Sequence, residues 1–319
     1  MEILILGGTS FVGRHITEEA VKKGHTVTLF NRGKSNPSAF PELRHITGDR
    51  REDASKLADE TWDAVIDPSA YSPADLQPVL DNITSGHYTF ISTISVYDDF
   101  KQGPAAEGSS IHMKQIDNDK VTGESYGPLK VMCEKIIEDT FKGEALIIRP
   151  GIVIGPHDPT DRFTYWAKRL DEPGPVLMPG AKHRKVQWID ARDLAQFVIS
   201  QIEKKAGGIF NVTADAMSMD SFAEAVRTDK PELVWVEDDE LLEQGIKPFE
   251  LPFWIPISED YPEGFILADN SKAKESGLVL RPVSVSAKDT RTWLREKSER
   301  ELKTGLKKER EQELLNRKM

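Results

Sequence analysis

The chain has 319 residues, of which 38% are hydrophobic, so it is long enough to bury two modest cores. Its formal net charge of −11 argues against a global basic face for nucleic acid. The single cysteine, Cys133, excludes an internal disulfide and fits a reducing, cytoplasmic compartment, and no apolar run reaches the roughly 20 residues of a membrane span.

Short apolar strands alternate with helical patterns over residues 1–213. The opening run lacks a basic segment, so we interpret it as a buried strand rather than a signal peptide. Strands are predicted at 3–6, 26–30, 44–47, 64–66, 88–92, 145–149 and 209–213. Helices fall between most of them, as at 12–23 and 127–141. Apolar strands separated by helices predict an α/β fold with a Rossmann-like, doubly wound parallel sheet and a smaller C-terminal substrate lobe.

Prolines break this pattern after Gly155. We expect residues 1–155 to form a dinucleotide-binding domain, with 186–213 returning to it. Residues 156–295 are expected to form mainly the substrate lobe. Residues 296–319 carry dense charge of both signs among spaced leucines, which predicts an amphipathic helical tail.

The first predicted strand runs directly into a glycine-rich loop, GGTSFVG at 7–13, and a helix follows. Glycine tolerates positive φ at such a turn, and the backbone N–H groups of the loop and the helix start can face a pyrophosphate. The loop does not match the dinucleotide fingerprint letter for letter. Its place at the start of a β-α-β pattern nevertheless predicts a phosphate cradle; the alternative is a tight turn without a ligand.

The second predicted strand ends at Asn31 and Arg32, the position that reads the adenosine ribose in dinucleotide-binding folds. An acidic residue there would accept the 2′-hydroxyl of NAD, whereas a guanidinium suits the 2′-phosphate of NADP. We therefore expect NADP as the cofactor, with NAD as the alternative. The competing interpretation makes Arg32 a solvated turn residue beside Gly33.

Tyr126 and Lys130 are four residues apart in a predicted helix and therefore share one face. An ammonium beside the phenol is expected to lower the pKa of the tyrosine, which can then exchange a proton with a substrate hydroxyl while hydride moves to or from a nicotinamide. Most such pairs are surface pairs. This one follows the phosphate loop and a strand that ends in hydroxyls at Ser92, Thr93 and Ser95.

In the order of these motifs the chain resembles extended short-chain dehydrogenases/reductases of the NAD-dependent epimerase/dehydratase branch. The matching segments are GGTSFVG at 7–13, GD at 48–49, FISTISVY at 90–97, YGPLK at 126–130, RPGIVIGP at 149–156, QWIDARDLA at 187–195 and DNSKAKESGL at 269–278. The resemblance implies an NAD(P)-dependent reductase, epimerase or dehydratase acting on a hydroxyl or carbonyl of a small molecule, with nucleotide sugars among the candidates. It also implies that a homodimer can form through the helix with the Tyr-Lys pair.

The resemblance assigns roles residue by residue. The catalytic set is Thr93, Tyr126 and Lys130. The cofactor-binding set is Gly7, Thr9, Ser10, Phe11, Val12, Gly13, Asn31, Arg32, Asp49, Arg50, Pro68, Ser69, Ala70, Pro150, Gly151, Ile152 and Val153. The substrate candidates are Tyr71, Tyr97, His157 and Arg162. We expect no metal, because no histidine-carboxylate spacing indicates one.

The chain departs from the family pattern in three places. Ser10 stands where the family has its middle glycine, the segment 67–70 replaces the usual apolar-Ala-Ala, and the stretch between Thr93 and Tyr126 is long. These departures keep a non-catalytic alternative open. The chain also resembles the chloroplast stem-loop-binding proteins, relatives that handle RNA, chiefly in the glycine loop and in overall length. In that alternative the fold would sense a dinucleotide or bind RNA, although the acidic charge argues against RNA.

Overall fold

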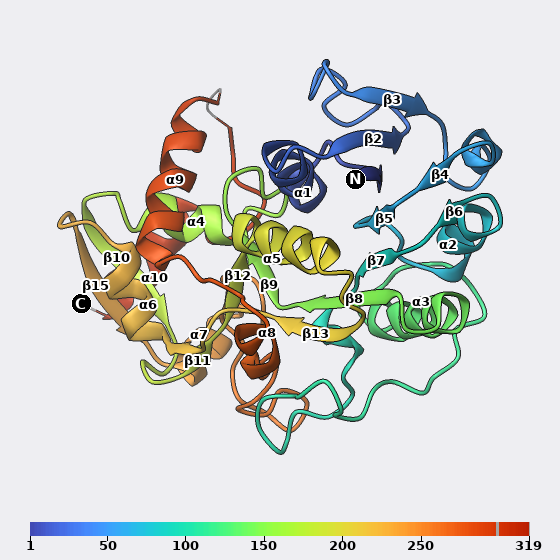
Figure 1. Cartoon of the computed structure of the whole chain (residues 1–319). Coiled ribbons are helices and arrows are strands. Elements are labelled where there is room, and N and C mark those ends of the chain that lie inside the picture. The colour runs from blue at the N-terminus through green and yellow to red at the C-terminus, as the bar shows by residue number, and fades with distance from the viewer. Residues whose placement is uncertain (298–299, 319) are drawn as a thin grey trace.

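A seven-stranded parallel sheet forms the centre of the first lobe, as the computed structural model in Figure 1 shows for the described residues 1–297 and 300–318. Its strand order is β13-β8-β7-β5-β1-β2-β3, and all neighbouring pairs are parallel. The strands are β1 (Glu2–Leu6), β2 (Thr26–Asn31), β3 (Arg44–Thr47), β5 (Ala64–Asp67), β7 (Tyr88–Ile91), β8 (Ala145–Pro150) and β13 (Gly208–Val212). The predicted fold class is therefore confirmed.

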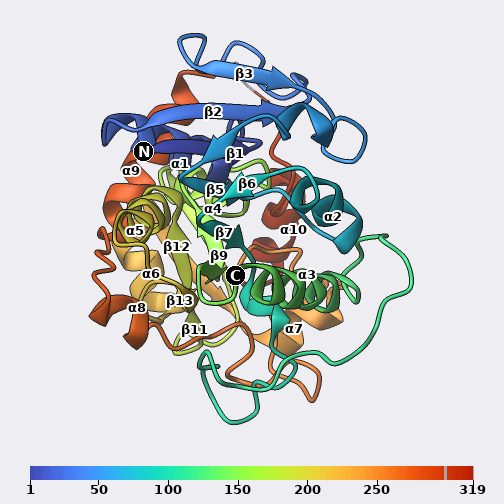
Figure 2. The same ribbon diagram turned by 45° about the vertical axis from the view of Figure 1, so that its right-hand side comes forward.

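Both faces of this sheet are covered, because an all-apolar strand supplies side chains to two cores. Ile3 and Ile5 of β1 belong to one core, and Leu4 and Leu6 to the other. The first core is covered by α1 (Phe11–Lys22) and α5 (Ala191–Glu203), and the second by η1 (Ala54–Leu57), α2 (Pro73–Leu80) and α3 (Tyr126–Phe141). Figure 2 shows α5 on one side of the sheet and α2 and α3 on the other.

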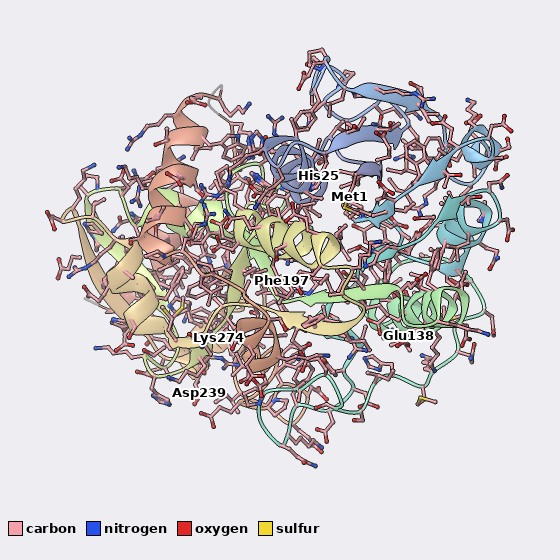
Figure 3. The ribbon with its side chains drawn as sticks, in the orientation of Figure 1. Met1, His25, Glu138, Phe197, Asp239 and Lys274 are labelled. Atoms are coloured by element: carbon pink, nitrogen blue, oxygen red, sulfur yellow. The ribbon has the colours of Figure 1, made fainter. Side chains whose placement is uncertain are left out.

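Aromatic packing joins α5 to the edge of the sheet. The ring of Phe197 in α5, labelled in Figure 3, meets the ring of Phe210 in β13 edge to face, with centroids 5.5 Å apart. Cys133 is fully buried in the opposite core, where a small apolar side chain fits. Residues 191–212 therefore pack as part of the first lobe: α5 covers one face of the sheet, and β13 pairs with β8, which precedes it by more than fifty residues in the chain.

The second lobe has its own core, centred on Trp166, Phe222 and Trp254. Its elements are α4 (Arg162–Arg169), β10 (Gly174–Pro179), β11 (Lys185–Val186), β14 (Met217–Ser218), α6 (Met219–Val226), β15 (Pro231–Val236), α7 (Asp238–Glu243), α9 (Val283–Arg295) and α10 (Lys308–Lys318). A parallel pair of β9 (Ile152–Ile154) and β12 (Trp188–Asp190) lies outside the main sheet, so 188–190 does not return to it as a strand. The exact lobe boundaries remain a prediction.

Shorter elements complete the chain: β4 (Thr61–Trp62), β6 (Thr84–Ser85), η2 (Ile94–Val96) and α8 (Ser271–Glu275). The long stretch between η2 and α3 is an irregular loop, which runs around the outside of α3 (Figure 1). In the predicted tail, Leu314 and Leu315 of α10 are buried, while residues 298, 299 and 319 lie outside the described residues. No helix in the described part of the chain is long and apolar enough to cross a membrane.

Candidate active site

A cleft of about 720 Å³ opens at the carboxyl ends of β1, β2, β3 and β5. This is where the strand order reverses, the place at which open α/β sheets bind their ligands. The cleft is lined by 6–13, 30–35, 48–51, Pro68, Ser69, Tyr71, Asp75 and Pro159. Twelve of the predicted cofactor residues are thus brought together: Gly7, Thr9, Ser10, Phe11, Val12, Gly13, Asn31, Arg32, Asp49, Arg50, Pro68 and Ser69.

The glycine loop has the shape of a phosphate cradle. Gly7 and Gly8 have φ of +116° and +84°, in the left-handed region that favours glycine. A Cβ on Gly13 would lie 3.0 Å from the backbone nitrogen of Gly8, so α1 begins directly against the loop. Ser10 at the N-cap of α1 is exposed and its side chain makes no capping hydrogen bond. These residues fit the diphosphate of a dinucleotide, which needs close backbone approach at a helix start.

Thr9 and Asn31 brace this loop from within the protein. The Thr9 hydroxyl donates to the carbonyl of Ser35 (2.7 Å). The Asn31 amide donates to the carbonyl of Gly7 (3.1 Å) and accepts from the backbone nitrogen of Gly33 (2.8 Å). Both side chains therefore hold the glycine loop against the turn that follows β2. Their direct contact with a cofactor stays a prediction.

Arg32 and Asp49 lie together where β2 and β3 end. The Arg32 side chain is 61% exposed, and its Nη1 is 3.9 Å from Oδ2 of Asp49. The guanidinium is thus only loosely held and remains available to an anion in the cleft.

Arg50 also lines the cleft, but its donors are engaged by protein groups. Its guanidinium donates to both carboxylate oxygens of the fully buried Asp67 (3.0 and 2.5 Å) and to the hydroxyl of Ser69 (2.9 Å). Burial raises the pKa of Asp67, but the Arg50 charge and hydrogen bonds outweigh this and hold that pKa below its usual range. In the sequence, Asp67 stood out only as a departure from the family pattern. A carboxylate at the end of a buried strand is the feature that could have indicated an ion pair there. Arg50 is therefore a fixed part of the cleft wall.

Tyr126 lies at the start of α3 and is hydrogen-bonded to the side chain of Thr93, which follows β7. Gly127 makes this approach feasible, since a Cβ there would lie only 2.0 Å from the backbone oxygen of Ser95. The first turn of α3 thus packs directly on the backbone of η2. The structure brings the predicted Thr93 and Tyr126 side chains together in this way.

Lys130 lies one turn further along α3 and is 3% exposed. Its Nζ donates to the backbone carbonyls of Ala70 and Ile91, both at 2.8 Å. The ammonium also lies 5.0 Å from the centre of the Tyr71 ring and 4.5 Å from that of Phe90. Burial lowers the pKa of Lys130 to about 8.

The direction of the tyrosine pKa is the reverse of the one expected from the sequence. Burial raises the pKa of Tyr126 to about 12, which the hydrogen bond with Thr93 lowers only in part. The expected lowering toward neutrality is wrong because Lys130 donates to backbone carbonyls instead of the phenol. Tyr126 is consequently a phenol at neutral pH, and it can act as a proton donor.

Replacing Lys130 with methionine is expected to remove a pH dependence from stability. The folded-state pKa of about 8 lies below the ordinary value of 10.5, so between the two the unfolded chain binds more protons and the unfolding free energy rises with pH. Wild type should gain about 2 kcal/mol over Lys130→Met between pH 7 and pH 9.5. Urea unfolding at both pH values measures this difference, and a constant difference would contradict the buried ammonium.

The substrate candidates fall in different places. The Tyr71 ring is 46% exposed and lies 6.1 Å from that of Tyr126. Arg162 is exposed at the start of α4, its charge acts on Tyr126, and it forms no side-chain ion pair with any other described residue. His157 is half-buried beside Trp293, with ring centroids 5.4 Å apart. Burial, followed by the charge of Arg14, lowers the pKa of His157 to about 4, so the ring is neutral.

Tyr97 does not face the cleft, which corrects its expected place beside the substrate. It is 2% exposed, donates to Oδ1 of Asn211 (2.6 Å) and accepts from Nη1 of Arg149 (3.0 Å). A buried phenol with both bonding positions filled has no capacity left for a ligand.

Ala70 and the run 150–153 lie outside the lining of the cleft, and their contact with a nicotinamide stays a prediction. Ala70 offers its carbonyl to Lys130. The run 150–153 leads from β8 into β9, and a Cβ on Gly151 would lie 2.9 Å from the Thr213 hydroxyl. Among the residues that the structure describes, no group of three histidine, cysteine or carboxylate side chains is placed to hold a metal ion.

Two curated relatives show how the chain compares in sequence. The chloroplast stem-loop binding protein of 41 kDa b from Arabidopsis thaliana is 27% identical over 246 residues, which cover 70% of this chain and 62% of that protein. The ketoreductase azaE of Aspergillus niger is 23% identical, and the match covers 93% of this chain and 98% of that protein. The chain thus spans less than two thirds of the first relative and nearly all of the second.

Solved structures share the fold. A UDP-glucose 4-epimerase superposes with a TM-score of 0.69 at 17% identity, covering 94% of this chain and all of that one. The UDP-N-acetylglucosamine 4-epimerase from Bacillus cereus gives 0.65 at 20% identity, covering 92% and 99%. The family model described as the NAD dependent epimerase/dehydratase family matches residues 3–213, most of the chain. The chain therefore belongs to the NAD-dependent epimerase/dehydratase family, as its motifs predicted.

Proposed function

We propose that this protein is an NADP(H)-dependent reductase that converts a carbonyl group of a small molecule to a hydroxyl. The observation that supports this most is the protonated Tyr126, hydrogen-bonded to Thr93 close to the dinucleotide cleft. When bound, the reduced cofactor would supply the hydride. Tyr126 would hold the proton that the developing alkoxide takes, Thr93 would orient the carbonyl oxygen, and Lys130 would hold the cofactor ribose.

Two observations favour reduction. Tyr126 carries its proton at neutral pH, and reduction needs a proton donor. The relative matched over nearly its whole length is named a ketoreductase. Epimerisation of a nucleotide sugar is the second candidate, supported by the fold shared with a UDP-glucose 4-epimerase that was solved with UDP-glucose. An epimerase keeps its cofactor through both half-reactions, so cofactor retained on purification would favour it.

We propose that Arg32 determines the preference for NADP over NAD. Its loosely held guanidinium would pair with the 2′-phosphate, while the neighbouring Asp49 carboxylate supports the NAD alternative by accepting a 2′-hydroxyl. Arg32→Ala is expected to raise the Kd for NADPH about tenfold, because one charge-assisted hydrogen bond is lost. The same change should leave NADH binding unchanged. Calorimetric titration measures both. Arg44→Ala, at the other end of β3, is the matched control; an equal effect on both cofactors would refute the assignment.

The proposed function is tested by titrating the purified protein with NADPH and NADH and then following NADPH consumption with ketones and nucleotide sugars. Micromolar NADPH binding with turnover of a ketone supports the reductase. NADPH binding without any turnover would instead support the dinucleotide-sensing alternative. Salt-sensitive RNA binding would support the RNA-binding alternative, since phosphate contacts release counterions.

A further inference from the structure

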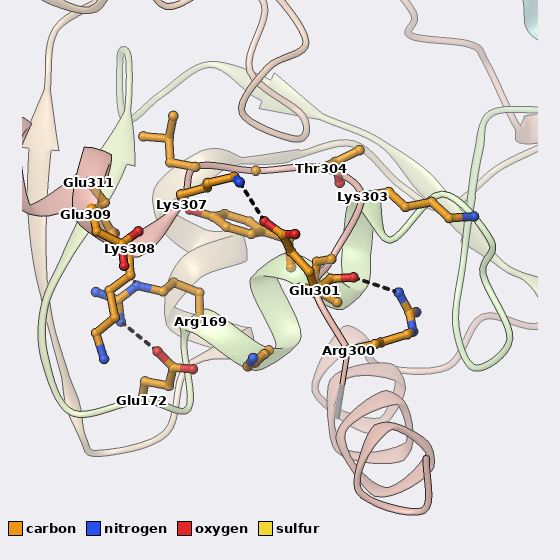
Figure 4. A pocket seen from close by; sticks show the side chains of 15 residues that line it. Arg169, Glu172, Arg300, Glu301, Lys303, Thr304, Lys307, Lys308, Glu309 and Glu311 are labelled. Carbon is orange, nitrogen blue, oxygen red and sulfur yellow. Dashed lines mark hydrogen bonds and ion pairs between the residues drawn. The ribbon is translucent and has the colours of Figure 1, made fainter. Parts of the chain in front are cut away.

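The segment 300–307, which we call the strap, is anchored to the second lobe. Leu302 and Leu306 pack against its core, and the strap continues into α10, whose Leu314 and Leu315 are buried. Figure 4 shows the strap passing along α4, with Arg300 and Lys303 toward one end and Lys307 toward the other. The strap therefore has a fixed base from which it can hold another part of the chain.

A second anchor is polar and buried. The Glu311 carboxylate in α10 is 2% exposed and accepts from Nε of Arg169 (2.7 Å) and from the backbone nitrogen of Leu177 (3.0 Å). A buried carboxylate with two such donors fixes the start of α10 against α4 and β10.

The strap holds Asp161, the residue before α4. The Arg300 guanidinium donates to both carboxylate oxygens of Asp161 (2.7 and 2.6 Å), and the backbone nitrogen of Lys303 donates to Oδ2 (3.1 Å). Asp161 is fully buried and has a φ of +61°, a conformation that costs a non-glycine residue free energy. The bonds from the strap offset that cost.

The loop that contains Asp161 reaches the proposed site through Pro159. Pro159 lines the dinucleotide cleft, and its carbonyl accepts from Nζ of Lys303 (2.9 Å). The carbonyl of Thr160 accepts from the hydroxyl of Thr304 (3.3 Å). Arg162, the next residue, acts electrostatically on Tyr126. The four-residue loop 159–162 thus connects the strap to the cofactor cleft, and its last residue carries a charge that acts on the tyrosine.

We propose that the strap sets the position of the loop 159–162, and that Asp161 and Arg300 are positioning residues for the cofactor and substrate sites. Without the two hydrogen bonds from the Arg300 guanidinium, Asp161 would keep a buried charge and an unfavourable φ with fewer partners. The loop would then relax away from the cleft. Neither residue touches the reacting atoms. The expected change in KM rests on the proposed function. The expected changes in NADPH affinity and in amide exchange of the loop do not depend on turnover.

The test compares Arg300→Ala with Arg295→Ala, a matched control whose guanidinium pairs with Asp171 (3.0 Å) on the surface. Arg300→Ala is expected to raise the Kd for NADPH and the KM for the ketone roughly tenfold, because a small displacement of a binding loop is amplified in affinity. Arg295→Ala should change neither. Arg300→Lys keeps the positive charge but cannot donate to both carboxylate oxygens in the same planar geometry, so it should recover part of the lost NADPH affinity.

Hydrogen exchange of the backbone amides separates positioning from general stability. Arg300→Ala should speed exchange in 157–162 while leaving α3 unchanged. Asp161→Gly tolerates the positive φ, so it should fold and still lose NADPH affinity if the carboxylate is the anchor. Unchanged exchange and affinity in both variants would overturn the proposal. A wild type that binds no dinucleotide would overturn the proposed function, and the exchange experiment would still decide on the strap.

Discussion

Tyr126→Phe is expected to lower kcat for carbonyl reduction about a thousandfold and to leave the Kd for NADPH within about twofold of wild type. The change removes one hydroxyl, which is hydrogen-bonded to Thr93 and carries a proton at neutral pH. The ring remains, so its contact with Tyr71 and the start of α3 should be preserved. The loss therefore falls on the proton-transfer step and spares cofactor binding.

Steady-state kinetics on a ketone that the wild type converts, together with calorimetric titration of NADPH, measures the two quantities. Tyr71→Phe is the matched control, since Tyr71 is a neighbouring phenol whose centroid lies 6.1 Å from that of Tyr126. It should keep kcat within about threefold of wild type. Full turnover by Tyr126→Phe would remove Tyr126 from the chemistry and, with it, the central argument for a reductase.

Arg149→Met is expected to lower the free energy of unfolding by about 3–5 kcal/mol, the largest stability effect of any single change considered for this chain. The side chains of Arg149 and Glu134 are both 2% exposed and form two hydrogen bonds, at 3.0 and 2.7 Å. Removing the guanidinium leaves the Glu134 carboxylate buried without its counter-charge. Ser92 also donates to that carboxylate (2.5 Å), so the strand end before Thr93 would be disturbed too.

Urea unfolding of four proteins measures this effect: wild type, Arg149→Met, Glu134→Leu and the double variant. The double variant should recover much of the loss, because it removes both charges and leaves neither unpaired. Arg44→Ala, which breaks a solvent-exposed pair with Glu60, is the control and should cost less than about 1 kcal/mol. A loss below about 1 kcal/mol for Arg149→Met would show that water reaches the Glu134 carboxylate.

Local patterns in the sequence determined the elements of the first lobe and their class. The strand at 44–47 was predicted to the residue, and the other six strands of the sheet to within one residue at each end. The inner strands are apolar throughout because they are buried on both faces, whereas β3 is a largely exposed edge strand. The glycine loop and the four-residue spacing of Tyr126 and Lys130 are also local features. A turn needing positive φ requires glycine wherever the chain goes next, and i and i+4 share a face in any helix.

The tertiary structure alone decided what those residues do to one another. Asp67 meets Arg50 across 17 positions of sequence, and Asp161 meets Arg300 across 139. Burial, rather than the neighbouring lysine, set the direction of the Tyr126 pKa. Packing turned Tyr97 inward to Asn211, which its sequence neighbours did not indicate. Desolvation and ion pairing depend on which distant segments enclose a group. The periodic pattern of one segment does not indicate which other segments will pack against it.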